Sequence, residues 1–446
     1  DLHRVDRRQR QMCIRDGVHG EACYDTWCLD PRRFTSHANV EMTSLKAIED
    51  YQNEFRFHFP HEHRPAARNA KTTPLTPFMD SENAAFTVIN GWERVEYIKP
   101  SKDFQPSLSF HFDETFEIVA KEVKNIQNNV GLTEVNGFNR FEISGPDADT
   151  FIDRMFCGNI THKPSRIGLG YLLNDFGMIK SEATISNIPS SDRGPNRIWY
   201  GSAAASEFHD MDWLKQHLKD DEEVTIKSLT NDQTILLLAG PKARDVLSRC
   251  SREDWSKEAF PWLSVRECFI GFSPATVMSV SFSGELAYEV HIPNSFLYAA
   301  YLTISNAGKG FGMKLFGSRA VESMRMEKGF LAWKSDLLTE FDPYETGLDR
   351  FVNLNKDNFI GKKALQNRFK DGMKQKLVCL KIDSKNSPAY GGASLIEDDK
   401  VIGTITSGEW GHRVNLNLAY AFVNLDKSIE GTRMTVSYTH LRAHET

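Results

Sequence analysis

Carboxylate, guanidinium and aromatic side chains gather in three short segments of the 446-residue chain. A carboxylate can hold a proton or accept from paired N–H donors, a guanidinium can hold a negative group, and an aromatic ring can stack on a flat ligand. The first segment contains Tyr171 and Glu182, the second Phe282, Glu285 and Glu289, and the third Arg325, Phe330 and Trp333. Together these residue types suit a planar ligand that carries hydrogen-bonding groups.

Each candidate also has a purely structural interpretation. Glu182 would face solvent from an ordinary strand, and Glu289 would be the charged edge of a hairpin. Arg325 and Glu327 lie two apart on an expected helix and point in different directions, so Arg325 either holds a negative group or bridges subdomains. Phe330 and Trp333 are of types that are commonly found in the core.

Alternating patterns and turn residues predict the elements that carry these side chains. The segment 170–185 reads as strand, NDFG turn and strand, which is typical of a hairpin. Two units with the order strand, Gly-Pro, helix lie near 138–156 and 234–250, which favours pseudo-repeated subdomains. Apolar residues spaced three and four apart predict a helix over 44–59, followed by an extended, proline-rich stretch.

Composition and motifs exclude several function classes. The net charge of −6 argues against binding nucleic acid, and no apolar run is long enough for a membrane span. Seven scattered cysteines favour free thiols in a reducing compartment, and we expect a cytoplasmic location. Cys23 and Cys28 form a C-x4-C pair that could bind metal in principle, but no second Cys or His pair lies at ligand spacing nearby. Prolines interrupt the histidines at 58, 61 and 63, which form no HExxH motif, so we expect no metal. No dinucleotide-binding fingerprint is present.

The segment 317–365, with its Arg-x-Glu helix, DPYETGLDRFV loop and FIGKKAL helix start, resembles the folate-binding aminomethyltransferases. This family includes the T-protein of the glycine cleavage system, and the resemblance is strongest to the carboxyl-terminal half of dimethylglycine and sarcosine dehydrogenases. It implies an α+β fold of several subdomains around a central folate-binding cavity, followed by a C-terminal antiparallel β-barrel.

The resemblance also assigns roles to the candidate residues. Glu182 stands where the family has an essential aspartate near folate N5 and N10, and Glu289 where a carboxylate pairs with the pterin donors. Phe282 replaces a family tyrosine. Tyr171, Phe282 and Trp333 would sandwich the ligand rings, and Arg325 could hold the glutamate tail. Glu182 is therefore the expected catalytic residue and the other five are expected to bind the cofactor.

The whole pattern predicts five regions. We expect non-native or disordered residues at 1–18 and 439–446, a remnant of a flavin oxidoreductase and its middle domain at 19–83, the folate domain at 84–372, and a truncated barrel at 373–438. The predicted function is capture of a one-carbon unit as methylene-tetrahydrofolate, in an N-methyl amine dehydrogenase of the dimethylglycine or sarcosine type.

Tetrahydrofolate is the expected cofactor here, and FAD is expected only in an upstream domain outside this chain, so that the chain alone lacks the oxidation half-reaction. The expected partners are an N-methyl amine or iminium and folate, with no nucleic acid and no membrane, and a homo-oligomer is possible. A stand-alone folate-dependent aminomethyl- or methyltransferase, including the sulfonium demethylase type, and a non-catalytic folate-binding module are the alternatives.

Overall fold

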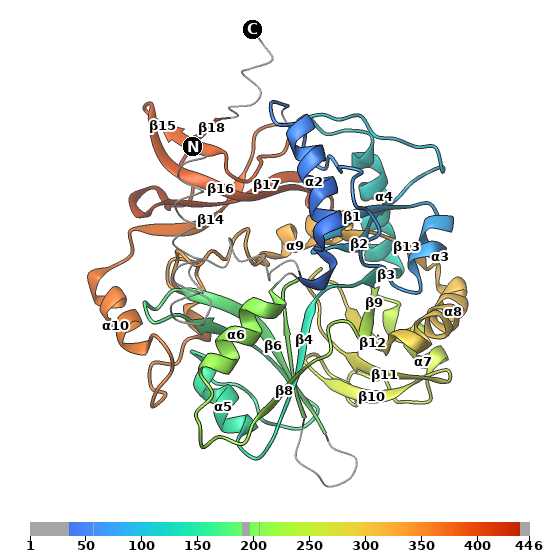
Figure 1. The fold of residues 1–446 in the computed structure, drawn as a ribbon. Coiled ribbons are helices and arrows are strands. Elements are labelled where there is room, and N and C mark those ends of the chain that lie inside the picture. The colour runs from blue at the N-terminus through green and yellow to red at the C-terminus, as the bar shows by residue number, and fades with distance from the viewer. Residues whose placement is uncertain (1–34, 57, 190–196, 205, 438–446) are drawn as a thin grey trace.

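Three β-sheets and the helices between them form most of the molecule (Figure 1). The computed structural model describes residues 35–56, 58–189, 197–204 and 206–437. The expected non-native ends, Cys23 and Cys28 lie outside these residues. Mixed helices and sheets in this arrangement confirm the predicted α+β class.

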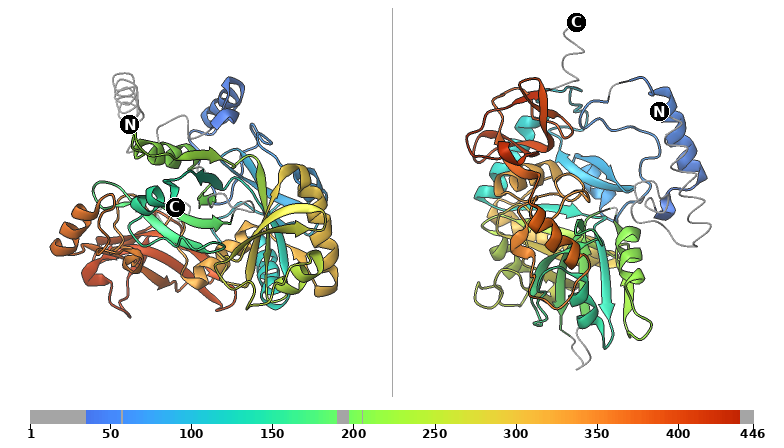
Figure 2. Two further views of the ribbon diagram at one scale, coloured as in Figure 1. Left: turned by 90° about the horizontal axis from the view of Figure 1, so that it is seen from below. Right: turned by 90° about the vertical axis from the view of Figure 1, so that its left-hand side faces the viewer.

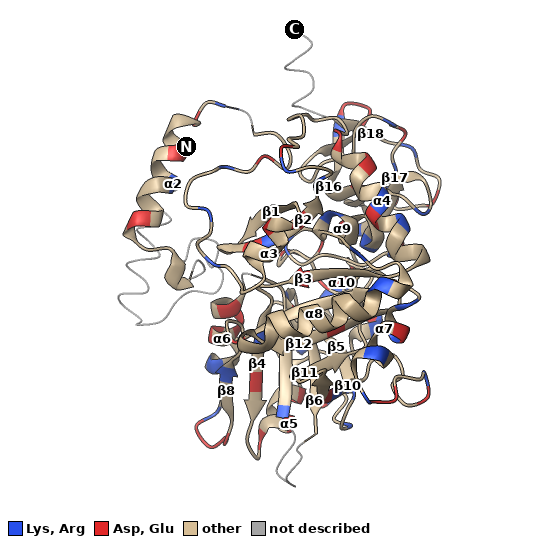
Figure 3. Ribbon diagram, turned by 90° about the vertical axis from the view of Figure 1, so that its right-hand side faces the viewer, with Lys and Arg blue, Asp and Glu red and all other residues tan. Residues whose placement is uncertain are grey.

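The amino-terminal part begins with helix α2 (Val40–Gln52), which ends earlier than the sequence pattern predicts. Asn39 starts it, because its side-chain oxygen accepts from the backbone N–H of Met42 at 2.9 Å. The predicted apolar face is not covered by other described residues, since the side chains of Ile48 and Tyr51 are 57% and 80% exposed. Figures 2 and 3 show α2 at the edge of the molecule, joined to the body by a long extended segment.

That segment leads to α3 (Thr76–Ser81) and to the two-stranded sheet of β1 (Ala84–Ile89) and β2 (Trp92–Ile98). Helix α4 (Thr115–Asn128) follows and packs on α9 (Ser318–Lys328). Helix α9 also contacts the carboxyl-terminal sheet, and α4 also contacts β2.

The two central sheets each contain one of the predicted Gly-Pro units. The five-stranded sheet has the order β5-β6-β7-β4-β8 and the six-stranded sheet the order β10-β11-β12-β9-β3-β13. The strands of the first are β4 (Asn139–Ser144), β5 (Ile167–Leu173), β6 (Ile179–Ile188), β7 (Arg197–Ser202) and β8 (Thr225–Ser228). Those of the second are β3 (Gly131–Val135), β9 (Gln233–Ala239), β10 (Val265–Ile270), β11 (Ser273–Met278), β12 (Ala287–Pro293) and β13 (Lys314–Leu315).

In each unit a glycine makes the turn from strand to helix. Gly145 leads from β4 to α5 (Ala148–Met155), and Gly240 leads from β9 to α7 (Ala243–Cys250). Their φ angles of +125° and +129° are disfavoured for residues with a Cβ. A Cβ on Gly145 would also lie 2.1 Å from the carbonyl oxygen of Glu223. The repeated sequence pattern therefore corresponds to a repeated structure, as predicted. Helices α6 (Glu207–Gln216) and α8 (Leu297–Gly308) complete this part.

The carboxyl-terminal part contains a five-stranded antiparallel sheet with the order β14-β17-β16-β15-β18. Its strands are β14 (Gln375–Lys381), β15 (Ser394–Glu397), β16 (Lys400–Gly411), β17 (Leu416–Asn424) and β18 (Thr435–Ser437), and α10 (Lys362–Asp371) precedes them. The predicted antiparallel strands are present. Strands β14 and β18 occupy opposite edges, and within the described residues no pairing joins them into a closed barrel.

Candidate functional site

The hairpin of β5 and β6 brings Tyr171 and Glu182 together. Its turn is held by Asn174, whose side-chain oxygen accepts from the backbone N–H groups of Phe176 and Met178 at 3.0 Å each. The strand register places Tyr171 directly opposite Glu182, and the tyrosine hydroxyl donates to Glu182 Oε2 at 2.6 Å. The hairpin predicted from the sequence is therefore confirmed, and it fixes the orientation of the candidate catalytic carboxyl.

Burial perturbs the acidity of this pair. Loss of water raises the pKa of Glu182 to about 7, and the Tyr171 hydrogen bond opposes that rise only in part. Burial, followed by the nearby Glu182 charge, also raises the pKa of Tyr171, so its hydroxyl keeps its proton and remains a donor. A carboxyl with a pKa near neutrality can both hold and release a proton at physiological pH.

Glu182 shares one face of its sheet with a strongly basic residue. On β6, Thr184 lies two residues after Glu182. Thr184 pairs with Gly201 on the neighbouring strand β7. Gly201 in turn pairs with Arg140 on the next strand, β4. Trp199 lies two residues from Gly201 on the same face. Because side chains alternate along a strand, Glu182, Thr184, Arg140 and Trp199 project to one side of the sheet, and Gly201 leaves that side free of a side chain at its position. Phe141, Tyr200 and Ile185 project to the opposite side and form an apolar cluster there.

This face meets the six-stranded sheet at the row that contains Glu289. Glu289 lies opposite Met278 in the register of β12 and β11. The Ser186 hydroxyl lies 3.5 Å from the Met278 sulfur, and the rings of Trp199 and His291 are 5.8 Å apart. Glu182 and Glu289 therefore come from two sheets whose facing sides are in contact (Figure 1).

The residues around Glu289 form a charged and incompletely bonded group. His291 Nε2 lies 3.1 Å from Glu289 Oε2 and donates to it, since an ionised carboxylate only accepts. Burial, with the Arg140 charge, lowers the pKa of His291 to about 4, so the ring is neutral. Its Nδ1 and the hydroxyl of Thr133, which shares the face of Glu289, are buried without a hydrogen-bond partner among the described residues. Sequence reasoning missed Arg140, His291 and Thr133.

Arg325 is bound entirely within the protein in the described structure. Its side chain is 1% exposed, and its guanidinium donates to Asp336 at 2.8 Å, to Ser407 at 2.9 Å and to Glu322. These contacts join α9 to the loop at 336 and to β16. These contacts are compatible with the bridging role, and the cofactor-binding role assigned to Arg325 stays a prediction.

The remaining aromatic candidates make no described contact with the Glu182 carboxyl, although Trp333 packs against the apolar cluster that contains Tyr171. Phe282 is 42% exposed in the loop between β11 and β12, and its ring stacks nearly parallel to that of Phe330 at 6.2 Å. Trp333 packs edge-on to His209 at 5.7 Å, and its Nε1 is buried without a partner among the described residues. Glu285, the other acidic candidate of this loop, forms an ion pair with Arg413. The assigned roles of Phe282 and Trp333 stay predictions.

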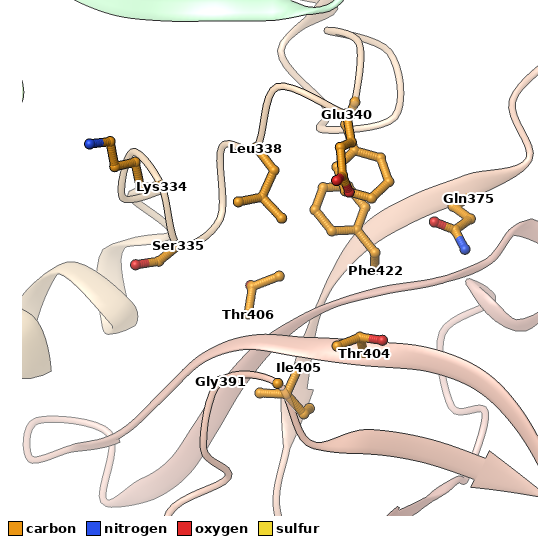
Figure 4. A pocket seen from close by; sticks show the side chains of 12 residues that line it. Lys334, Ser335, Leu338, Glu340, Gln375, Gly391, Thr404, Ile405, Thr406 and Phe422 are labelled. Atoms are coloured by element: carbon orange, nitrogen blue, oxygen red, sulfur yellow. The ribbon is translucent and has the colours of Figure 1, made fainter. Parts of the chain in front are cut away.

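A pocket of about 550 Å³ lies elsewhere, between the loop 334–341 and the carboxyl-terminal sheet (Figure 4). Lys334, Glu340, Thr404 and Phe422 are among the residues that line it, and none of the six predicted site residues does. The stacked rings of Phe341 and Phe422 form part of its wall. We therefore place the candidate site at the contact of the two central sheets, where Glu289 and the unpaired polar atoms are. The Glu182 carboxyl lies on the same face of its sheet, four residues before Ser186 on β6.

The histidine-rich stretch binds a carboxylate of the protein. His63 Nε2 lies 2.6 Å and His61 Nδ1 3.3 Å from the buried Glu96 carboxylate. Across the described part of the chain, no group of three His, Cys, Asp or Glu side chains is arranged to hold a metal ion. None of the described helices is both long enough and apolar enough to cross a bilayer.

Comparison with known proteins identifies three matching families. The GCVT N-terminal domain matches residues 75–356, the glycine cleavage T-protein C-terminal barrel domain matches 375–445, and the FAD dependent oxidoreductase central domain matches 19–73. The aminomethyltransferase T of the glycine cleavage system from Bartonella henselae has a similar fold. Its TM-score is 0.70 at 21% identity, over 82% of this chain and 93% of that one.

Curated relatives are similar over most of the chain. Human mitochondrial dimethylglycine dehydrogenase is 31% identical over 94% of this chain, and mouse mitochondrial sarcosine dehydrogenase is 26% identical over 91%. In both cases the match covers 48% of the relative, so the chain spans about half the length of these proteins. It corresponds to their carboxyl-terminal half, as the sequence resemblance indicated.

Proposed function

The chain belongs to the family of the GCVT N-terminal domain, and on that premise we propose that it binds tetrahydrofolate and receives a one-carbon unit to give the methylene form. The observation that carries the proposal is the position of Glu182. This carboxyl has a pKa raised to about 7 and lies on a sheet face that meets the row containing Glu289.

The described residues fit reduced folate. A pterin edge presents adjacent N–H donors, and Glu289 is a carboxylate that accepts from such a pair in bidentate fashion. The buried Thr133 hydroxyl and His291 Nδ1 lack partners in the protein and can bond a polar ligand. Gly201 leaves space on the facing sheet, since an added Cβ would have no atom closer than 3.8 Å. A flat ring system can therefore approach the backbone there.

Bound tetrahydrofolate supplies the N5 and N10 nitrogens that take up the one-carbon unit. Within the protein, the ionised Glu182 carboxylate takes the proton that is lost at the nitrogen beside it. Tyr171 donates to Glu182 Oε2 and so keeps the other oxygen directed away from the tyrosine. Tyr171 is buried and Glu182 is partly buried, which limits the access of water and protects a reactive iminium from hydrolysis.

We infer that the oxidation step belongs to a flavin-dependent part of a longer protein. The match of residues 19–73 to an FAD dependent oxidoreductase central domain supports this inference. The names of two relatives, dimethylglycine dehydrogenase and sarcosine dehydrogenase, suggest an N-methyl amine as the substrate and FAD as the second cofactor. Both relatives are mitochondrial by name, so a mitochondrial location competes with the cytoplasmic one that we predicted. Homo-oligomer formation stays a prediction.

Calorimetric titration of the purified chain with tetrahydrofolate tests the proposal. We expect saturable binding that Glu289→Gln weakens about 10- to 100-fold, because a charge-assisted hydrogen bond contributes about 1.5–3 kcal/mol. Glu285→Gln is the matched control, since that carboxylate pairs with Arg413 and should leave the affinity unchanged. We expect Glu182→Gln to retain most of the affinity and to lose one-carbon transfer. Absence of binding by the unaltered chain would refute the proposal.

A further inference from the structure

Arg140 is a buried cation without a carboxylate partner. Its side chain is 4% exposed, and its hydrogen bonds among the described residues involve its backbone. The backbone N–H donates to Thr230 Oγ1 at 3.1 Å, and the carbonyl oxygen accepts from the Leu229 N–H at 2.8 Å. No ion pair or side-chain hydrogen bond is described for its guanidinium, which lies 5.9 Å from the Trp199 ring centroid. A buried charge without a hydrogen-bonded partner lowers the stability of the folded state. A polar ligand that accepts from the guanidinium would remove that penalty.

The surroundings of Arg140 leave room for such a ligand. Gly201 lies directly opposite Arg140, and its φ is not positive, so the backbone there does not require glycine. The two atoms nearest to an added Cβ would be the backbone oxygens of Thr184 and Asn139, at 3.8 and 4.0 Å. The face beside Arg140 is therefore open where a side chain would otherwise stand.

Across the sheet contact, the groups that face Arg140 are acceptors. The Arg140 charge lies near enough to lower the pKa of His291, and the Glu289 charge lies near enough to Arg140 to favour its charged form. Glu289 offers a carboxylate, and His291 offers an unpaired Nδ1 because its Nε2 hydrogen is directed to Glu289. The Arg140 guanidinium, a strong donor, thus lies near two acceptors, the Glu289 carboxylate and His291 Nδ1. A ligand that fits must present a hydrogen-bond acceptor next to hydrogen-bond donors.

The pyrimidinone edge of a pterin has this pattern, since its carbonyl O4 lies next to N3–H and the 2-amino group. We propose that Arg140 donates to O4 of the pterin while Glu289 accepts from the neighbouring N–H groups, an inference that rests on the proposed folate binding. Arg140 is then a specificity residue that distinguishes a 4-oxo from a 4-amino pterin. A 4-amino group would direct its own hydrogens at the guanidinium.

The test compares the affinities of tetrahydrofolate and its 4-amino analogue by titration calorimetry. We expect the unaltered chain to prefer the 4-oxo ligand about 10- to 100-fold, and Arg140→Met to bind both within a few-fold of each other. Arg140→Lys keeps a charged donor and should retain part of the preference. Arg266→Met is the control for loss of a partly buried arginine elsewhere, since Arg266 packs on the buried Trp255 ring.

Thermal unfolding without ligand gives a second readout. Removal of an unpaired buried charge should leave the midpoint of Arg140→Met unchanged or higher, whereas loss of a structural arginine would lower it. If Arg140→Met fails to fold, or folds and keeps the full preference for the 4-oxo ligand, the assignment of Arg140 is overturned while folate binding stands. If the unaltered chain binds neither ligand, the proposed function falls, and this inference falls with it.

Discussion

The raised pKa of Glu182 predicts that this residue destabilises the folded chain at neutral and alkaline pH. The carboxyl has an ordinary pKa of 4.5 when unfolded and one of about 7 in the structure. Between these values the folded state binds more protons than the unfolded state, so stability falls as the pH rises and then levels off above about 7. At 1.36 kcal/mol per pKa unit, the cost above pH 7 is up to about 3 kcal/mol.

Glu182→Gln should remove that cost, because glutamine is neutral and its oxygen can still accept from Tyr171. The difference in thermal midpoint between Glu182→Gln and the unaltered chain should be near zero below pH 4.5. It should then grow to a few degrees in favour of the variant above pH 7. Differential scanning calorimetry from pH 4 to 9 measures this difference. In the same variant we expect one-carbon transfer to fall by about 10²-fold or more, since the proton acceptor is gone.

Glu134→Gln is the matched control for this experiment. Burial raises the pKa of Glu134 to about 7 as well, but its side chain lies on the opposite face of the six-stranded sheet from Glu289. It should show the same pH-dependent gain in stability and leave transfer unchanged. A midpoint difference for Glu182→Gln that does not change with pH, or transfer that survives the substitution, would refute the reasoning about Glu182.

Two further predictions concern the scaffold. Asp336→Ala leaves the buried guanidinium of Arg325 without its buried carboxylate partner, and it should lower the free energy of unfolding by about 3–5 kcal/mol, as measured by urea denaturation. Gly145→Ala should lower the midpoint markedly, since its Cβ would overlap the carbonyl oxygen of Glu223; Gly372→Ala, at φ +81° in open space, should lower it by much less. Equal losses at the two glycines would show that strain in φ alone, without the clash, sets the cost.

The features that the sequence predicts well are local. The Asn174 turn, the two Gly-Pro units and the short strands of the carboxyl-terminal sheet each depend on residues within about ten positions of one another. Turn chemistry and side-chain alternation act over that range, so the chain itself displays them. Helix α2 was also predicted from the sequence. Its apolar face is exposed and is not covered by other described residues. Periodicity indicates an apolar face but not what that face contacts.

The candidate site depends on pairings between distant strands, and this is why sequence reasoning found only part of it. Arg140 and Glu289 are about 150 residues apart in the chain, and only the contact of the two sheets brings their faces together. The one signal for Arg140 was a charged residue in the alternating strand at 138–143. Asp336 was missed for another reason, since it lies in a loop whose path no periodicity describes. Its ion pair with Arg325 joins α9 to the loop at 336.

The central claim is that reduced folate binds where the two central sheets meet. A crystal structure of the chain with tetrahydrofolate bound tests it most directly. We predict that the pterin edge lies against Glu289 and that the N5 and N10 region lies beside Glu182. Density for the ligand in the pocket beside Lys334 and Phe422, with both carboxylates free of it, would contradict the account.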